Sequence, residues 1–226
     1  MYYFILFFLV IAFFIYIQVR FHRLSHNEYQ ILQLSDPNKD LLEKTLDEKY
    51  PTVILDVVKN WNGINALTGN TEIIKSPKFK KVMNGFLNFY NIPLSVKSDN
   101  TLNMYDSGDT LYLTKQDMTR YFLIQIKGNS KVILFAPKEE IYLYPTTKKA
   151  TSRVNFWKIE MLTNQNKDEE KQKYLEKFPD FNKAKYIEIL LSEGHMLFIP
   201  YGWWFTVLSV NDNIRIVSTS SSLFSW

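Results

Sequence analysis

Residues 193–209, EGHMLFIPYGWWFTVLS, decide the fold of this chain. Two apolar runs, 196–199 and 203–210, lie on either side of a Pro-Tyr-Gly segment at 200–202. Aromatic and β-branched residues favour strands, and a short Pro/Gly segment between two such runs is typical of a turn. This stretch therefore predicts two consecutive strands of a β-structure.

The same pattern continues on both sides of this stretch, where short apolar runs alternate with turn segments such as 128–130. Many short strands separated by Gly, Asn and Pro turns favour an antiparallel sandwich or barrel. A polar, charged segment at 163–178 interrupts the strands and is predicted to form a helix and a loop. The further predicted strands are 121–127, 131–135, 186–191 and 214–219.

Helices are predicted before the β-structure. Ser35-Asp36-Pro37 and Ser76-Pro77 each combine a capping side chain with an early proline, which is typical of a helix N-terminus. Between them, residues 52–58 are rich in β-branched side chains and predict a strand. The expected organisation is a juxtamembrane connector and helix at 20–50, followed by one domain at 51–226.

Residues 1–19 contain no charged side chain and are almost entirely apolar. Because about 20 apolar helical residues cross the hydrocarbon core of a bilayer, this segment predicts a transmembrane anchor in contact with lipid. A cleaved signal peptide is the alternative, but the segment lacks a basic start and a small-residue cleavage site. Arg20 and Arg23 follow the segment, so the positive-inside tendency predicts a single-pass protein with a cytosolic C-terminal domain.

The composition of the 226 residues excludes several kinds of site. There is no cysteine, so disulfides, iron–sulfur clusters and thiol nucleophiles are excluded. The net charge of +4 is spread along the chain, which argues against a nucleic-acid partner. There are three histidines, and two of them, His22 and His26, follow the apolar N-terminus, so the body contains only His195.

Three segments of the chain are similar to a known family. QIKGNSKVILFAP (125–137), KFPDF (177–181) and the stretch at 193–209 resemble the cupin-like JmjC domains of Fe(II)- and 2-oxoglutarate-dependent hydroxylases, nearest to the asparaginyl-hydroxylase type. The resemblance covers about residues 50–220. It implies a mainly β fold, the double-stranded β-helix or jelly roll, with flanking N-terminal helices.

The resemblance also implies an iron site made of a His-x-Asp pair and a second histidine after a Trp-Trp pair, and a lysine that holds 2-oxoglutarate. By spacing from Gln125, the His-x-Asp positions are Lys115 and Asp117. The second histidine position is Phe205, and the lysine position is Ser130. One of the four residue types is retained, so neither iron nor 2-oxoglutarate nor another metal is expected to bind.

The degenerate positions suggest a physical hypothesis. Residues two apart on a strand share a face, so Lys115 is expected to neutralise Asp117 in the barrel mouth while Phe205 fills the adjoining space. The alternative is a frayed strand with a solvated Lys115. Gln125 and Trp204 are candidates for pocket lining, although Trp204 is also expected to pack between the sheets.

These observations favour a membrane-anchored, non-catalytic binding or scaffold module with a protein partner. The tail at 220–226 is expected either to dock through its apolar side chains or to support a homodimer. An oxygenase of the hydroxylase or demethylase type, with a non-standard site, is the first alternative. A structural membrane protein of a virion or organelle is the second, because the composition rich in Lys, Asn, Ile, Tyr and Phe suggests an AT-rich, viral or protist genome.

Overall fold

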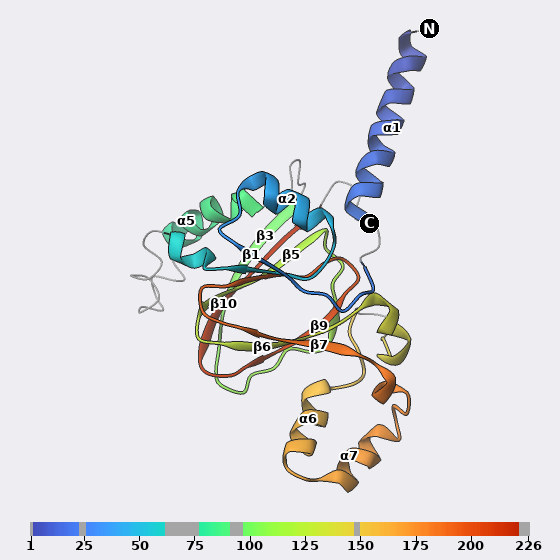
Figure 1. Cartoon of the computed structure of the whole chain (residues 1–226), viewed down its shortest axis with the longest axis vertical. Coiled ribbons are helices and arrows are strands. Elements are labelled where there is room, and N and C mark those ends of the chain that lie inside the picture. Colours follow the sequence, from blue (N-terminus) through green and yellow to red (C-terminus); the bar gives the residue numbers. More distant parts are fainter. Residues whose placement is uncertain (1, 23–25, 62–76, 91–96, 147–149, 222–226) are drawn as a thin grey trace.

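The computed structural model describes residues 2–22, 26–61, 77–90, 97–146 and 150–221 (Figure 1). Within these ranges two sheets face each other. The larger has the strand order β1 (Leu32–Ser35), β2 (Thr52–Leu55), β8 (Met196–Phe198), β5 (Arg120–Lys127), β10 (Asn213–Ser221) and β3 (Lys97–Tyr105). The smaller has the order β4 (Thr114–Lys115), β9 (Trp204–Ser209), β6 (Ser130–Phe135) and β7 (Tyr186–Leu191).

All strand pairs in these sheets are antiparallel except β1 and β2, which pair in parallel. Helices cover the outer faces, with α2 (Lys39–Asp47) and α5 (Pro77–Leu87) beside the larger sheet and α6 (Phe156–Asn164) and α7 (Asp168–Leu175) beside the smaller (Figure 1). The predicted mainly β sandwich is therefore confirmed. Short 3-10 turns complete the elements: η1 (Val57–Asn60), η2 (Asn88–Tyr90), η3 (Pro137–Tyr142) and η4 (Phe181–Lys183).

Three apolar layers follow from the alternation of side chains along the strands. On β5, Phe122 and Ile124 belong to a cluster with α2 and α5, whereas Leu123 belongs to the cluster between the two sheets. A third cluster packs α6 and α7 against the smaller sheet, and Phe135 and Trp204 belong to it. Side chains in the middle cluster face the interior of the jelly roll, which is the space that the candidate site occupies.

Some predicted boundaries differ from the structure. The helix predicted from 35–37 begins later, because the side chain of Asn38 accepts a hydrogen bond from the Leu41 amide and caps α2. The strand predicted at 52–58 ends at Leu55, where Asp56 has a left-handed backbone conformation (φ 55°) and starts η1. Helix α5 begins at Pro77 as expected, and its predicted cap, Ser76, lies outside the described residues.

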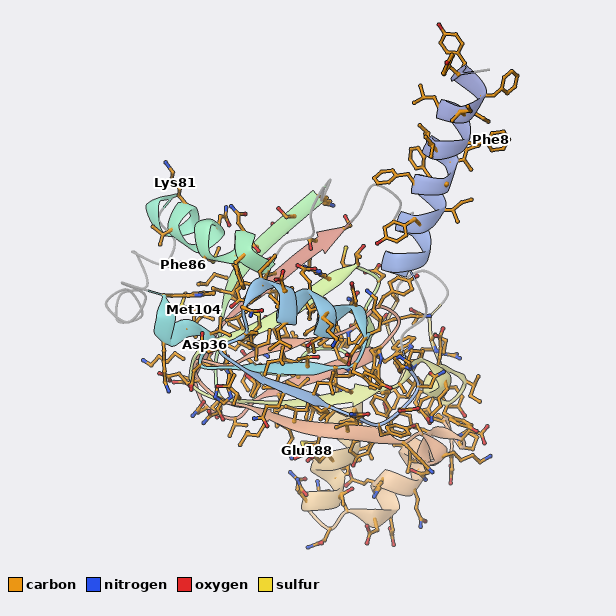
Figure 2. The ribbon with its side chains drawn as sticks, turned by 45° about the horizontal axis from the view of Figure 1, so that its top comes forward. Phe8, Asp36, Lys81, Phe86, Met104 and Glu188 are labelled. Carbon is orange, nitrogen blue, oxygen red and sulfur yellow. The ribbon has the colours of Figure 1, made fainter. Side chains whose placement is uncertain are left out.

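The apolar N-terminal segment is helical, forming α1 (Tyr2–His22). The large apolar side chains from Tyr2 to Tyr16 are exposed, and Phe8 points away from the helix axis in Figure 2. Among the residues that the structure describes, no helix combines the length and the apolar character that crossing a bilayer requires. The structure therefore does not support the transmembrane anchor predicted for residues 1–19, nor the single-pass localisation derived from it.

Gly128 fixes the turn between β5 and β6, and replacing it with alanine is expected to destabilise the fold. Its φ is +73°, and a Cβ atom would lie 2.6 Å from Asn211 Oδ1 and 2.6 Å from the Asp212 carbonyl oxygen. The conformational and steric penalties together predict a loss of about 2–4 kcal/mol in the free energy of unfolding.

The matched control is Gly108→Ala, because Gly108 has a similar φ of +88° but nothing within 4 Å of the added Cβ. That variant is expected to lose about 1 kcal/mol. Urea unfolding of both variants measures the difference. Equal losses would show that the close approach of Asn211 and Asp212 to Gly128 is not what restricts this turn.

Candidate functional site

The orientation of strand β9 determines which side chains face the interior of the jelly roll. Trp203, Phe205 and Val207 belong to the cluster between the sheets, whereas Trp204 belongs to the outer cluster against α6. Trp203 is fully buried between the sheets. Trp204 lies on the outer face. It therefore neither lines the interior space nor packs between the two sheets, and both predictions for it are wrong.

Phe205, at the position predicted for the second metal-binding histidine, fills part of the interior. Its side chain is 4% exposed, and its ring centroid lies 5.0 Å from that of Tyr121. It pairs across the sheet with Leu134 of β6, which belongs to the same interior cluster. The residue therefore contributes a ring to an apolar core, at a place where a metal site would need an electron-pair donor.

Lys115 lies on the other face of the sheet. In the β4–β9 register Lys115 pairs with Trp204 and Thr114 pairs with Phe205, and directly paired residues share a face. The Lys115 ammonium lies 2.5 Å from Glu140 Oε2, and the Trp204 indole N–H donates to the same oxygen at 3.4 Å. The hypothesis that Lys115 points into the mouth and neutralises Asp117 is therefore wrong.

Asp117 does not share a face with Lys115, because strand β4 ends at Lys115. The next residue, Gln116, is buried, and its amide group donates to the carbonyl oxygens of Met118 and Ile199 at 2.8 and 2.9 Å. These bonds hold a turn in which Asp117 is exposed. The alternation rule that placed both residues in the mouth therefore does not apply.

Glu140 is the residue that sequence reasoning missed at this position. It lies in η3, 25 residues along the chain from its partner Lys115. Pairs of Glu residues after a proline, as in Pro137-Lys138-Glu139-Glu140, are common on solvated turns, so the sequence carried no distinctive signal. Only the packing of η3 beside β4 and β9 brings the carboxylate to the ammonium.

Ser130 and Gln125 form a buried polar pair inside the jelly roll. Both side chains are fully buried, and the Ser130 hydroxyl donates to Gln125 Oε1 at 2.8 Å. Gln125 donates in turn to the carbonyl of Lys127 at 2.7 Å. The neighbouring Lys131 faces outward, as the alternation predicts, and forms ion pairs of 3.1 Å with Glu160 and Glu188, of which Glu188 is labelled in Figure 2.

Arg215 is a second residue that sequence reasoning missed, and unlike Glu140 it lies in the interior. It lies on β10 opposite Gln125 and is 1% exposed. Burial lowers the pKa of its guanidinium, although the nearby Tyr105 hydroxyl acts in the opposite direction. The available signal was a basic residue within an apolar strand, Ile214-Arg215-Ile216-Val217, where the alternation requires it to share a face with Val217.

The residues at the family's iron positions do not fit the metal. An ammonium in an ion pair has no lone pair to offer, a phenyl ring has none, and Lys115 and Phe205 lie on opposite faces of the sheet. In the described part of the chain, no three His, Asp or Glu side chains are grouped as metal ligands. Asp117 is the one residue of the expected ligand type, and a single carboxylate does not make a facial triad.

Comparisons with known proteins found relatives that match part of this chain. Lysine-specific demethylase 8 of Danio rerio is 32% identical over 121 residues, which are 53% of this chain and 27% of that protein. tRNA wybutosine-synthesizing protein 5 of Gallus gallus is 35% identical over 103 residues, which are 46% of this chain and 28% of that protein. The chain thus spans less than a third of each relative.

The X-ray structure of E. coli ycfD is similar at 12% identity, with a TM-score of 0.42 and coverage of 63% of this chain and 30% of that one. The family model described as a cupin-like domain matches residues 74–218, which is more than half of the chain. The resemblance to JmjC-type cupin-like domains is confirmed by this match and by the relatives. The chain belongs to the cupin-like domain family.

Proposed function

We propose that this cupin-like domain is a non-catalytic binding module that has lost the iron chemistry of its oxygenase and demethylase relatives. One observation carries the proposal: Lys115 pairs with Glu140 on the outer face of the smaller sheet, while Phe205 is buried on the inner face. Two ligands to one ion must converge on it, and these two positions diverge. The proposal includes a protein partner, because the even spread of charge offers no surface typical of nucleic-acid binding.

The alternative function, a 2-oxoglutarate-dependent oxygenase with a non-standard site, has one supporting observation, which is the similarity to a protein named as a lysine demethylase. It would require Asp117 to bind the metal with ligands from outside the family positions. The exposure of Asp117 leaves that carboxylate free to approach a metal ion. A metal titration therefore separates the two functions.

The test is anaerobic calorimetric titration of the whole chain with Fe(II), and with Mn(II) as a redox-inert probe, with and without 2-oxoglutarate. We expect no stoichiometric metal binding in the anaerobic titration. In a parallel aerobic assay with Fe(II) we expect no conversion of 2-oxoglutarate to succinate above the protein-free rate. The control is Asp117→Asn, which is expected to behave like the wild type. Stoichiometric binding by the wild type that Asp117→Asn removes, together with succinate formation in the aerobic assay, would establish the oxygenase alternative.

A further inference from the structure

A cavity lies on the outer face of the smaller sheet, between the sheet and α6, and is called the α6 cavity below. Lys131 of β6 and Leu208 of β9 pair across the sheet, so their side chains lie next to each other on one face. Helix α6 lies beside this sheet (Figure 1), and the cavity that it forms with these two residues has a volume of about 400 Å³. Sites for small ligands range from about 300 to 1,000 Å³.

One face of α6 forms a wall of the α6 cavity. The residues of the helix that line it are Trp157, Glu160, Met161 and Asn164. Their spacing of three, four and seven residues from the first places them on one side of the helix. The Trp157 indole N–H donates to Thr206 Oγ1 of β9 at 2.7 Å, and this buried bond holds α6 against the sheet. Two walls of the cavity are therefore parts of regular elements that are fixed to each other.

The charges beside the α6 cavity do not cancel. The Lys131 ammonium lies 3.1 Å from Glu160 Oε1 and 3.1 Å from Glu188 Oε1. Burial would lower the pKa of Lys131, but its hydrogen bonds to these two carboxylates outweigh burial and raise the pKa, so the ammonium remains charged at neutral pH. One ammonium therefore faces two carboxylates, and the group of three has a surplus of one negative charge.

One oxygen of this group also lacks a donor. Glu160 Oε2 is buried without a hydrogen-bond partner among the described residues. Lys171 of α7 lines a second cavity, of about 290 Å³, which Glu160 also lines, but within the described ranges no ion pair joins these two side chains. A buried acceptor without a donor is unfavourable, and a charged one more so. The site therefore lacks a hydrogen-bond donor that carries a positive charge.

We propose that the α6 cavity binds an arginine side chain of the protein partner. A guanidinium supplies both missing components, because it brings N–H donors for Glu160 and a positive charge for the group. Met161, which is 49% exposed, and Leu208 provide an apolar wall for the methylene stem of the arginine. Arginine fits this wall better than lysine, because a guanidinium is more weakly hydrated than an ammonium.

Glu160 can bind such a ligand while Lys131 keeps a partner. The Glu160 side chain is 27% exposed and lines the cavity. The last torsion of a glutamate is broad and roughly twofold, so rotation about it lets either oxygen face the cavity, while Glu188 still pairs with Lys131. The side-chain amides of Asn164 and Gln165 line the same cavity, and their oxygens can accept the remaining N–H groups of the guanidinium.

This inference rests on the proposed function for the existence of a protein partner, and it adds the chemistry by which that partner is recognised. The absence of iron binding plays no part in it. The test is made in EDTA, so a failure of arginine binding would leave the result of the metal titration unchanged, and metal binding in that titration would leave the arginine result unchanged.

The probe is N-acetyl-L-arginine methylamide, titrated into the isotopically labelled whole chain and followed by the backbone and indole N–H NMR signals of α6. We expect saturable binding, and binding weaker by about tenfold or more for N-acetyl-L-citrulline methylamide, in which a neutral urea replaces the guanidinium. Glu160→Gln retains the size of the side chain and removes its charge, so it should weaken binding of the arginine probe by about tenfold or more. The matched control is Glu48→Gln, which removes the same charge from the exposed end of α2, beside the larger sheet, and should leave binding unchanged.

Absence of saturable binding of the arginine probe by the wild type would overturn the proposal. Equal binding by wild type and Glu160→Gln would do so as well, because it would remove the carboxylate from recognition. The comparison of the arginine and citrulline probes uses the wild type, so the proposal stays testable if Glu160→Gln fails to fold, and equal binding of the two probes would contradict it. Free L-arginine identifies the source of the ligand: we expect it to bind no more tightly than the capped probe, and tighter binding would assign the cavity to a free amino acid instead of a protein.

Discussion

Replacing Glu43 with glutamine is expected to lower the free energy of unfolding at neutral pH by about 2–4 kcal/mol, because it leaves Arg120 buried without its charge partner. Glu43 lies on α2, and its carboxylate binds both terminal nitrogens of Arg120 at the start of β5. The Arg120 side chain is 3% exposed and that of Glu43 is 19% exposed. The bond from Arg120 to the Tyr90 carbonyl remains in the variant, so the loss falls below that of a completely isolated charge.

The same ion pair makes the free energy of unfolding depend on pH in the acidic range. Burial alone would raise the pKa of Glu43, but the hydrogen bonds and charge of Arg120, assisted by Lys39, outweigh it and hold the pKa below its ordinary value. A carboxyl group with a lowered pKa in the folded state stabilises the fold above its unfolded-state pKa, about 4.3 for Glu. This contribution is lost as the pH falls through the lower pKa of the folded state.

Urea unfolding of wild type and Glu43→Gln between neutral pH and pH 3 measures both effects. The difference between them should be largest at neutral pH and should shrink below the ordinary carboxyl pKa. The control is Glu48→Gln at the exposed end of α2, which should stay within about 0.5 kcal/mol of the wild type. A difference between Glu43→Gln and wild type that is constant with pH would assign the effect to packing instead of charge.

The pattern of strands was predictable because it depends on local composition. The strands predicted from the apolar runs at 121–127 and 131–135 and the Gly turn between them are confirmed by β5 and β6. The turn at 200–202 likewise separates β8 from β9. Such features need only neighbouring residues, and that is the range over which propensity and periodicity act.

The pairings of charges were not predictable, because each joins segments far apart in the chain. Glu43 and Arg120 are 77 residues apart, and Lys115 and Glu140 are 25 apart. The orientation of Lys115 depends on the β4–β9 register, in which it pairs with Trp204, and β4 has only two residues. Alternation fixes the face of a side chain only inside a continuous strand, so the prediction for Asp117 failed at the turn that Gln116 stabilises.

Phe205→Ala is expected to lose about 3–5 kcal/mol in the free energy of unfolding, because it leaves a cavity in the cluster between the sheets. The Phe205 ring is 4% exposed and packs against Tyr121 and the strand that contains Leu134. For a chain of this size, the loss corresponds to a fall in the thermal midpoint of about 6–20 °C. The control is Tyr112→Ala, since Tyr112 is 77% exposed, and it should change stability by no more than about 0.5 kcal/mol.

Phe205→His tests whether a metal ligand can be restored at this packed position. The substitution restores the residue type of the second metal ligand, but it places a polar ring in an apolar cluster without a partner, so we expect lower stability and no gain in Mn(II) affinity. Adding Lys115→His should not rescue metal binding, because that side chain lies on the opposite face, beside Glu140 and Trp204. Stoichiometric Mn(II) binding by the double variant would show that both positions can reach the interior, and it would remove the observation on which the proposed non-catalytic function rests.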